Sequence, residues 1–348
     1  MRYTNVRLAG LGYELPPRVV TSADIERRLA PVYERLRLPE GRLEMMSGIR
    51  ERRFWDNGAR PSSVATLAGR KAIAASGLRT DQLGALFHVS VCRDFLEPAT
   101  ANVDHHGLGL SPRTLLFDIS NACLGALDGM VTLANMIELG QVEAGVIVAG
   151  EMGETLVERT IEWLLNDATL TRQTIKPAFA SLTIGSGAAA IVLAHERLAP
   201  DKPRLIGGAA RCSTADADLC VSTADTGFDS ATAPLMNTDS EALLKAGCAL
   251  AADTWGDFLA ATGWRGGEIT RSFTHQVGVA HRRALYDAIG LPIERDFATL
   301  EFLGNVGSVS LPITLAIGSE RRPIASGDRA ALLGIGSGLN CMMLGLEW

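Results

Sequence analysis

One stretch constrains the fold of this chain more than any other, because it runs from a strand through a cysteine into a helix. Residues 115–119 form an apolar run of strand length. After Cys123 the apolar residues recur at helical spacing until Gly140, a typical helix stop. Cys123 therefore lies at or just before a helix N-terminus, where the helix dipole favours a thiolate. A buried cysteine that packs as a small hydrophobe is the alternative.

Composition excludes several classes of protein. With 348 residues, the chain can form two core-bearing units or one large α/β domain. A net charge of −6 argues against general binding to nucleic acid or anionic membranes. We expect no signal peptide, and no apolar run approaches the roughly 20 residues that span a bilayer. The six dispersed cysteines predict reduced thiols in the cytoplasm, with no disulfide framework and no metal site.

Strands and helices are expected to alternate along the chain. The expected strands are 6–15, 83–91, 115–119, 144–149, 182–193, 204–211, 269–273, 297–302, 330–334 and a last one ending at Trp348. The expected helices are 21–32, 62–77, 101–109, 124–139, 239–261, 280–289 and 309–318. A plausible linker lies at 200–203, and a polar, alanine-rich insertion follows residue 211.

The two halves of the chain share this pattern. Each half has a strand that delivers a reactive residue to a helix, Cys123 in the first and His275 in the second. We therefore predict an internally duplicated α/β protein with halves 1–200 and 201–348. Its site is expected where the halves meet, at the C-terminal ends of the strands.

Four short segments form a candidate catalytic set. A cysteine nucleophile with a histidine and an asparagine elsewhere in the chain suits acyl transfer, and these are Cys123, His275 and Asn305. The glycine-rich turn 336–338 offers backbone N–H groups that, with the Cys123 N–H, would form an oxyanion hole. Taken singly, each residue has a structural alternative: a core histidine, a turn asparagine and a packing turn. Their combination favours catalysis.

These segments resemble the thiolase-fold condensing enzymes of the ketoacyl-ACP synthase III type. The resemblance covers essentially the whole chain and rests on Asn121-Ala122-Cys123-Leu124-Gly125, Thr274-His275-Gln276-Val277, Gly304-Asn305-Val306-Gly307, Gly334-Ile335-Gly336-Ser337-Gly338 and Gly48-Ile49-Arg50-Glu51-Arg52. It implies a five-layer αβαβα thiolase fold. It also implies that Cys123 accepts the acyl group and that His275 and Asn305 stabilise the second nucleophile. The Cys123 and Ser337 amides are expected to form the oxyanion hole, and Gly336, Gly338 and Arg50 to bind substrate.

Within that group the chain looks most like the OleA-type enzymes, through residues 90–100 and 331–341. Those enzymes join two fatty acyl-CoAs head to head without decarboxylation, so a base must remove an α-proton. The resemblance implies that this base is Glu97, acting across the interface of a homodimer, with a solvated loop carboxylate as the alternative. It further implies a 2-alkyl-3-ketoacyl-CoA product that feeds olefin or β-lactone lipid synthesis by downstream enzymes, with CoA thioesters as substrates and no cofactor.

One departure leaves the acyl carrier open. Synthase III enzymes usually carry a Trp and an Arg that sandwich the CoA adenine, and Arg42 and Met46 occupy those places here. CoA and acyl carrier protein are therefore both retained as carriers. The alternative functions are a decarboxylating 3-oxoacyl-ACP synthase III that uses malonyl-ACP, an acyltransferase to hydroxyl or amine acceptors, and a non-catalytic subunit of a heterodimer.

Overall fold

The computed structural model describes residues 1–222 and 236–348, and within these residues the main sheet has nine strands in the order β11-β12-β13-β8-β1-β7-β6-β4-β5. These strands are β1 (Val6–Glu14), β4 (Ala85–His88), β5 (Leu115–Asp118), β6 (Ala144–Glu151), β7 (Gly187–His195), β8 (Arg204–Cys212), β11 (Arg271–Thr274), β12 (Arg329–Gly336) and β13 (Asn340–Glu347). Two small sheets pair β2 (Arg18–Thr21) with β3 (Glu51–Phe54), and β9 (Cys220–Ser222) with β10 (Met236–Thr238).

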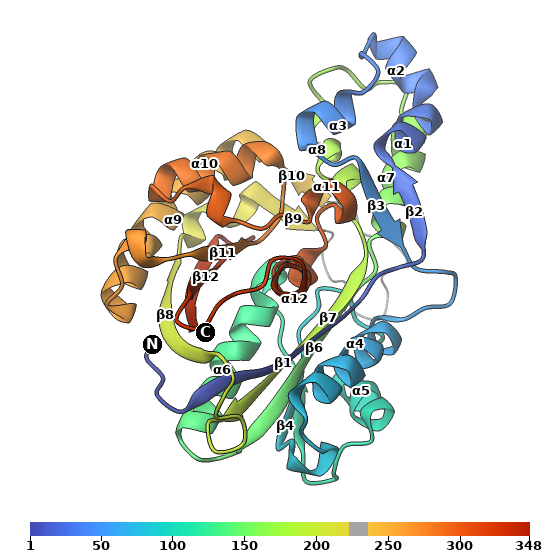
Figure 1. Cartoon of the computed structure of the whole chain (residues 1–348). Helices are drawn as coiled ribbons and strands as arrows, with labels where there is room; N and C mark the ends of the chain where they lie inside the picture. Colours follow the sequence, from blue (N-terminus) through green and yellow to red (C-terminus); the bar gives the residue numbers. More distant parts are fainter. Residues whose placement is uncertain (223–235) are drawn as a thin grey trace.

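Helices cover the outer faces of the sheet, and further helices lie between its two groups of strands (Figure 1). They are α1 (Ser22–Arg28), α2 (Ala30–Leu36), α3 (Arg42–Ser47), α4 (Pro61–Ser76), α5 (Ala101–Leu108), α6 (Gly125–Glu138), α7 (Glu154–Asn166), α8 (Lys176–Phe179), α9 (Ser240–Thr262), α10 (Val279–Ile289), α11 (Leu300–Leu303) and α12 (Ser310–Arg321).

Three buried clusters define five layers. One cluster packs α4 and α5 on β4, β6 and β7, and another packs α9 and α10 on β12 and β13. The largest cluster holds α6 and α12 between the two groups of strands. Both faces of β12 are therefore covered, with Leu332 in the central cluster and Leu333 in an outer one, which explains why the strand is apolar throughout. The predicted five-layer thiolase fold is confirmed.

The strand β1 links the two groups of strands. It pairs antiparallel with β7 along most of its length and touches β8 through the Arg7–Arg204 pair. Gly10 and Gly12 let α4 approach closely, since a Cβ on either would lie 2.3 Å from a helix carbonyl oxygen. The predicted division at residue 200 falls in the connection from β7 to β8, and the sheet continues across it.

Most predicted elements are present, with three differences. Residues 297–302 do not form the predicted strand, and helix α11 begins at Leu300. The first predicted helix is broken at Leu29, where Pro31 in the next turn starts α2. The strand at 115–119 was expected to be buried, but β5 is the edge of the sheet and Leu115 is 48 % exposed.

The polar insertion predicted after residue 211 lies partly outside the described residues, and its described ends form β9 and β10. None of the helices in residues 1–222 and 236–348 is long and apolar enough to cross a membrane.

Candidate active site

A cavity of about 730 Å³ is lined by residues from both halves of the chain. The lining includes five residues predicted to form the site: Cys123, His275, Asn305, Gly336 and Ser337. Three of them come from strand ends, because Cys123 follows β5, His275 follows β11 and Gly336 ends β12. The rest of the lining is mainly apolar, which suits a hydrocarbon chain better than a polar substrate.

Cys123 lies in a single 3-10 turn, Ala122–Leu124, that leads directly into α6. Ala122 has a φ of 45°, a left-handed conformation that residues other than glycine rarely adopt. Gly125 lets the start of α6 approach the end of β4, since a Cβ there would lie 2.2 Å from the Val89 carbonyl oxygen. This sharp turn presents the cysteine to the cavity.

The pKa of Cys123 is shifted in the direction opposite to the one expected from the helix N-terminus, which favours a thiolate. Burial raises the pKa of its thiol to about 12, and the charge of Glu151 and the neighbouring Cys220 raise it further. The nearby helix N-terminus does not outweigh these effects. Cys123 is therefore a thiol at neutral pH and must lose its proton as it attacks.

His275 is a neutral base in the same cavity. Burial, assisted by His281, lowers the pKa of its imidazole to about 4. Its backbone N–H donates to the Leu333 carbonyl at 3.0 Å, which fixes it at the end of β11. Among the described residues, its Nδ1 is buried without a hydrogen-bond partner. The His275 imidazole also lines the cavity, where it can form a hydrogen bond with a bound substrate.

The Asn305 side chain is oriented by its own loop. Its Oδ1 accepts from the Gly307 N–H at 3.1 Å and from Ser310 Oγ at 3.4 Å, so Nδ2 is left as a donor. The backbone of Asn305 pairs with that of Thr183 and Gly185, which belong to the first half of the chain. The loop is therefore fixed to the first half of the chain. The Asn305 side chain supplies an amide N–H to the cavity.

The glycine-rich turn packs directly on the cysteine turn. A Cβ on Gly336 would lie 3.4 Å from the Cys123 backbone nitrogen. Asn340 Nδ2 joins the two turns, since it donates to the Ser337 carbonyl at 3.2 Å and to Asn121 Oδ1 at 3.3 Å. The Gly336 backbone therefore lies beside the Cys123 N–H, where the sequence predicts an oxyanion hole.

Among the cavity residues that sequence reasoning missed, the one nearest to the chemistry is Glu151, at the end of β6. It is 5 % exposed and lines the cavity. Its Oε1 accepts from the Val91 N–H at 2.9 Å and from the Ser308 N–H and Oγ at 3.2 and 2.6 Å, and its Oε2 accepts from the Cys92 N–H at 3.2 Å. A carboxylate that ends an otherwise apolar strand was the available signal.

Three predicted site residues are not part of the cavity lining formed by the described residues: Glu97, Arg50 and Gly338. Glu97 is exposed, in the loop between β4 and α5. Arg50 is also exposed and forms an ion pair of 2.7 Å with Glu301. A single chain therefore assembles the nucleophile, the histidine, the asparagine and the glycine-rich turn, but not the predicted base.

Arg42 and Met46, which stand where synthase III enzymes usually carry the Trp and Arg that sandwich the adenine, lie in different surroundings. Met46 lines the cavity, whereas the Arg42 guanidinium lies over the Phe179 ring at 5.6 Å. Arg42 is thus engaged within its own chain.

Known proteins of the condensing-enzyme type match this chain over its whole length. A family model described as 3-oxoacyl-[acyl-carrier-protein (ACP)] synthase III C terminal matches residues 259–348. Two proteins named acyl-CoA:acyl-CoA alkyltransferase, from Shewanella oneidensis and Xanthomonas campestris, are 42% and 36% identical to this chain, with 100% of each chain covered. A β-ketoacyl-ACP synthase III from Roseiflexus castenholzii is 27% identical, covering 98% of this chain and 97% of its own length.

The solved structures of Xanthomonas campestris OleA are similar throughout. A cerulenin-bound form has a TM-score of 0.93 and 36% identity, covering 100% of this chain and 98% of that chain. A Cys-to-Ser variant with bound lauric acid and lauroyl-CoA has the same TM-score and covers 99% of this chain and 100% of that chain. In other structures of that protein, either one glutamate or one cysteine is replaced. These two positions are separated by as many residues as Glu97 and Cys123 are in this chain.

Proposed function

Since the chain belongs to the acyl-CoA:acyl-CoA alkyltransferase family, we propose that it joins two fatty acyl-CoAs by a Claisen condensation without decarboxylation. The observation that carries this proposal is the apolar cavity lined by Cys123, His275 and Asn305. The carrier is proposed to be CoA, in agreement with the names of the relatives, and the reaction uses only CoA thioesters and side chains of the protein.

In the first step, Cys123 Sγ attacks the thioester carbonyl carbon of one acyl-CoA. The new C–S bond forms as the bond to the CoA sulfur breaks, and the thiol proton passes to the departing CoA. His275 is neutral at pH 7, so its unprotonated ring nitrogen can relay the proton from Cys123 Sγ to the sulfur of the departing CoA. The Cys123 and Ser337 amides would hold the oxyanion formed at the carbonyl.

In the second step, Glu97 removes an α-proton from a second acyl-CoA, whose thioester oxygen accepts hydrogen bonds from His275 and from Asn305 Nδ2. The carbanion attacks the Cys123 thioester, the C–S bond breaks, and the thiolate of Cys123 regains a proton. The products are one 2-alkyl-3-ketoacyl-CoA and one CoA. We expect this product to supply enzymes of olefin or β-lactone lipid synthesis.

The proposal assigns Glu97 to the cavity of a partner subunit in a homodimer. Its support is that Glu97 is exposed in one chain while apolar neighbours in its loop are exposed with it: Val91 at 52 %, Phe95 at 38 % and Leu96 at 48 %. Exposed apolar residues gathered in one loop are typical of an interaction surface. The edge strand β5, with exposed Leu115, lies beside the loop and would extend that surface.

Glu151 is the other carboxylate near the nucleophile, and we assign it a positioning role. Both of its oxygens already accept hydrogen bonds from Val91, Cys92 and Ser308. It would hold the start of the Glu97 loop and the Asn305 loop together.

A cytoplasmic location is retained in the proposal, supported by six free cysteines.

Incubation of the purified protein with myristoyl-CoA alone tests the proposed function. Release of free CoA together with a β-keto product, both measured by mass spectrometry, is the expected result. Strict dependence on malonyl-ACP would instead identify a decarboxylating synthase, and transfer of the acyl group to an added amine or alcohol would identify an acyltransferase of another kind.

A further inference from the structure

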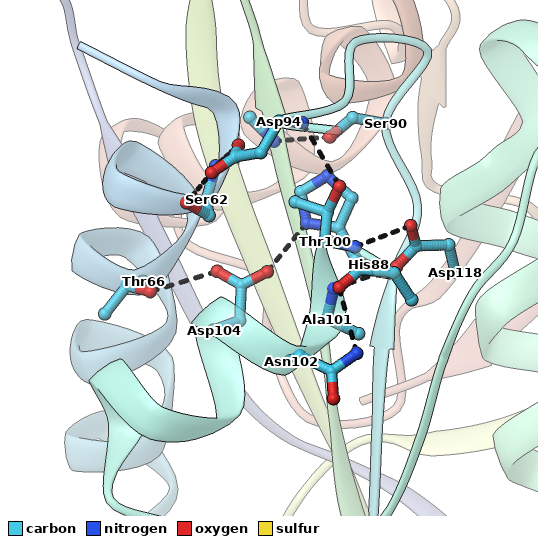
Figure 2. Close-up of polar contacts among 12 residues, drawn as sticks. Ser62, Thr66, His88, Ser90, Asp94, Thr100, Ala101, Asn102, Asp104 and Asp118 are labelled. Carbon is cyan, nitrogen blue, oxygen red and sulfur yellow. Dashed lines mark hydrogen bonds and ion pairs between the residues drawn. The ribbon is translucent and has the colours of Figure 1, made fainter. Parts of the chain in front are cut away.

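The loop that carries Glu97 (residues 91–100) is anchored by a network of buried and half-buried polar side chains that the proposed chemistry does not use (Figure 2). We call it the anchoring network, and it comprises Ser62, Thr66, His88, Asp94, Thr100, Asp104 and Asp118. Its members come from α4, from the ends of β4 and β5, from the loop itself and from α5. The network therefore joins the Glu97 loop to α4, α5 and the ends of β4 and β5.

The centre of the network is an ion pair that is almost completely buried. His88 Nδ1 lies 2.8 Å from Asp104 Oδ2, and the side chains are 1 % and 0 % exposed. Thr66 Oγ1 donates to the other Asp104 oxygen at 3.0 Å. Burial alone would lower the pKa of His88, but Asp104, assisted by Asp118 and Glu151, raises it, which favours the imidazolium. The pair thus ties β4, α5 and α4 together beneath the loop.

Two further carboxylates hold the loop near its ends. Asp94, within the loop, accepts from the Ser62 N–H at 2.9 Å and from Ser62 Oγ at 2.6 Å, at the start of α4. Asp118 accepts from the Thr100 and Ala101 N–H groups at 2.8 and 2.9 Å, at the start of α5. Each carboxylate satisfies N–H groups that a helix N-terminus leaves unpaired.

The loop is also closed on itself and linked to the cavity. The Asp94 N–H donates to Thr100 Oγ1 at 3.2 Å, which draws the two ends of the segment 94–100 together. At the other side, Glu151 binds the Val91 and Cys92 N–H groups. Only the tip, residues 95–99, projects from this frame, and Glu97 lies in its middle.

A buried ion pair of this kind adds little net stability compared with apolar residues of the same size. Its location, beneath a loop whose only proposed chemical group is Glu97, indicates another role. We propose that the anchoring network is a positioning device for the base: it fixes the Glu97 loop so that the carboxylate reaches the α-carbon of the second acyl-CoA. This inference rests on the proposed function and deepens it, because it predicts that the network matters for α-deprotonation and not for acylation of Cys123.

The test separates the two steps in variants of the network. Acylation of Cys123 is followed by mass spectrometry of the intact protein, and α-deprotonation by incorporation of deuterium from D2O at the α-carbon of acyl-CoA. Asp104→Asn and Thr100→Val should lower α-exchange and condensation by about 100-fold, the scale expected for a misplacement of about 1 Å. Acylation of Cys123 should stay within about two-fold of the unmodified protein.

Thr254→Val is the matched control, since Thr254 is equally buried, its hydroxyl donates to the Leu250 carbonyl within α9 and also contacts the Cys341 thiol, and it takes no part in the anchoring network. It should leave both steps unchanged. If Asp104→Asn fails to fold, Thr100→Val and Thr66→Val remove single hydroxyls at nearly constant shape and carry the test. Asp94→Glu, which keeps the carboxylate, should retain more activity than Asp94→Asn.

Glu97→Gln distinguishes failure of this inference from failure of the proposed function. Loss of α-exchange in Glu97→Gln with normal exchange in Asp104→Asn and Thr100→Val would overturn the positioning role alone. Normal exchange and condensation in Glu97→Gln would overturn the proposed base itself. Equal loss of acylation and exchange in the network variants would show a purely structural role and would also overturn the inference.

Discussion

The two sides of the site are built in opposite ways. On the nucleophile side, Cys123, His275 and Asn305 line one cavity within a single chain, each held by backbone contacts at the end of a strand or in a fixed turn. On the base side, Glu97 is exposed and lies in a loop that its own chain anchors from below. The residues of the first side meet within one chain, whereas the proposed base of the second side lies outside the cavity of its own chain.

This contrast relates the chemistry to the assembly. Holding an acyl group on a thiol needs only the cavity, so one chain suffices for the first step. In the proposed reaction, the carbanion is made by a carboxylate that the loop of residues 91–100 supplies. The pairing of chains would therefore decide the type of reaction, while the cavity decides which acyl chains enter.

The largest effect is expected from Cys123→Ala, which removes the nucleophile side. Without Sγ no acyl-enzyme forms, so CoA release and β-keto product should both fall by several orders of magnitude. Free CoA is measured with a thiol reagent and the product by mass spectrometry. Cys212→Ala, at an exposed cysteine outside the cavity, is the control. Product formation by Cys123→Ala would contradict the role of Cys123 as the nucleophile.

Glu97→Gln removes only the base side. Condensation should fall by about 10²- to 10⁴-fold, the usual contribution of a general base, while Cys123 is still acylated by myristoyl-CoA. The acylated protein and the product are both measured by mass spectrometry. Glu162→Gln, at an exposed carboxylate on α7, should change neither. Loss of acylation in Glu97→Gln would mean that the two sides are not separate.

Acid should lower the free energy of unfolding through His275, a residue of the nucleophile side. Its pKa is about 4 in the folded protein and near 6.5 when it is freed from burial. Between these values the unfolded chain binds more protons, so the free energy of unfolding falls as the pH drops from 6.5 to 4, by about 3 kcal/mol. His281, whose pKa is also lowered, acts in the same direction.

Urea unfolding from pH 7 to 4.5 measures this dependence. His275→Gln should flatten it relative to the unmodified protein, because a group that does not titrate replaces one that does. Identical pH dependence in the two proteins would contradict the buried, neutral state of His275.

The smallest effect is expected at Arg50, which was predicted to bind substrate but lies outside the cavity and pairs with Glu301 at the surface. Exposed ion pairs contribute less than about 1 kcal/mol. Arg50→Ala should therefore change the melting temperature only slightly and leave KM for myristoyl-CoA unchanged. A large rise in KM with constant kcat would return Arg50 to the binding site.

Much of the fold was predictable because strand and helix periods are strong in this chain. The apolar runs of β6 and β12 and the helical spacing after Cys123 marked their elements correctly. Burial was harder to predict. The run at 115–119 is as apolar as a central strand, yet β5 lies at the edge of the sheet, and sequence alone does not tell an apolar edge strand from a central strand. The error at 297–302 has a similar cause, since short apolar runs suit either structure.

The site was predictable in its members and less so in its electrostatics. Cys123, His275 and Asn305 were found through local sequence patterns. The pKa of Cys123 was expected to be low because of the helix N-terminus, but burial and Glu151 raise it. Glu151 was missed, and the His88–Asp104 pair was not noticed, because their importance comes from contacts between residues far apart in the sequence. Locally, Glu151 showed only as a carboxylate at the end of an apolar strand, and the His88–Asp104 contact left no pattern in the sequence.

Mixing two inactive variants tests most directly whether Glu97 acts across the interface. Cys123→Ala keeps the base and Glu97→Gln keeps the nucleophile, so a mixed dimer has one complete site if the base comes from the partner. After dissociation and reassembly in equal amounts, about half of the dimers are mixed and the mixture should regain about a quarter of the unmodified activity. Mixed dimers detected by native mass spectrometry that remain inactive would contradict the account.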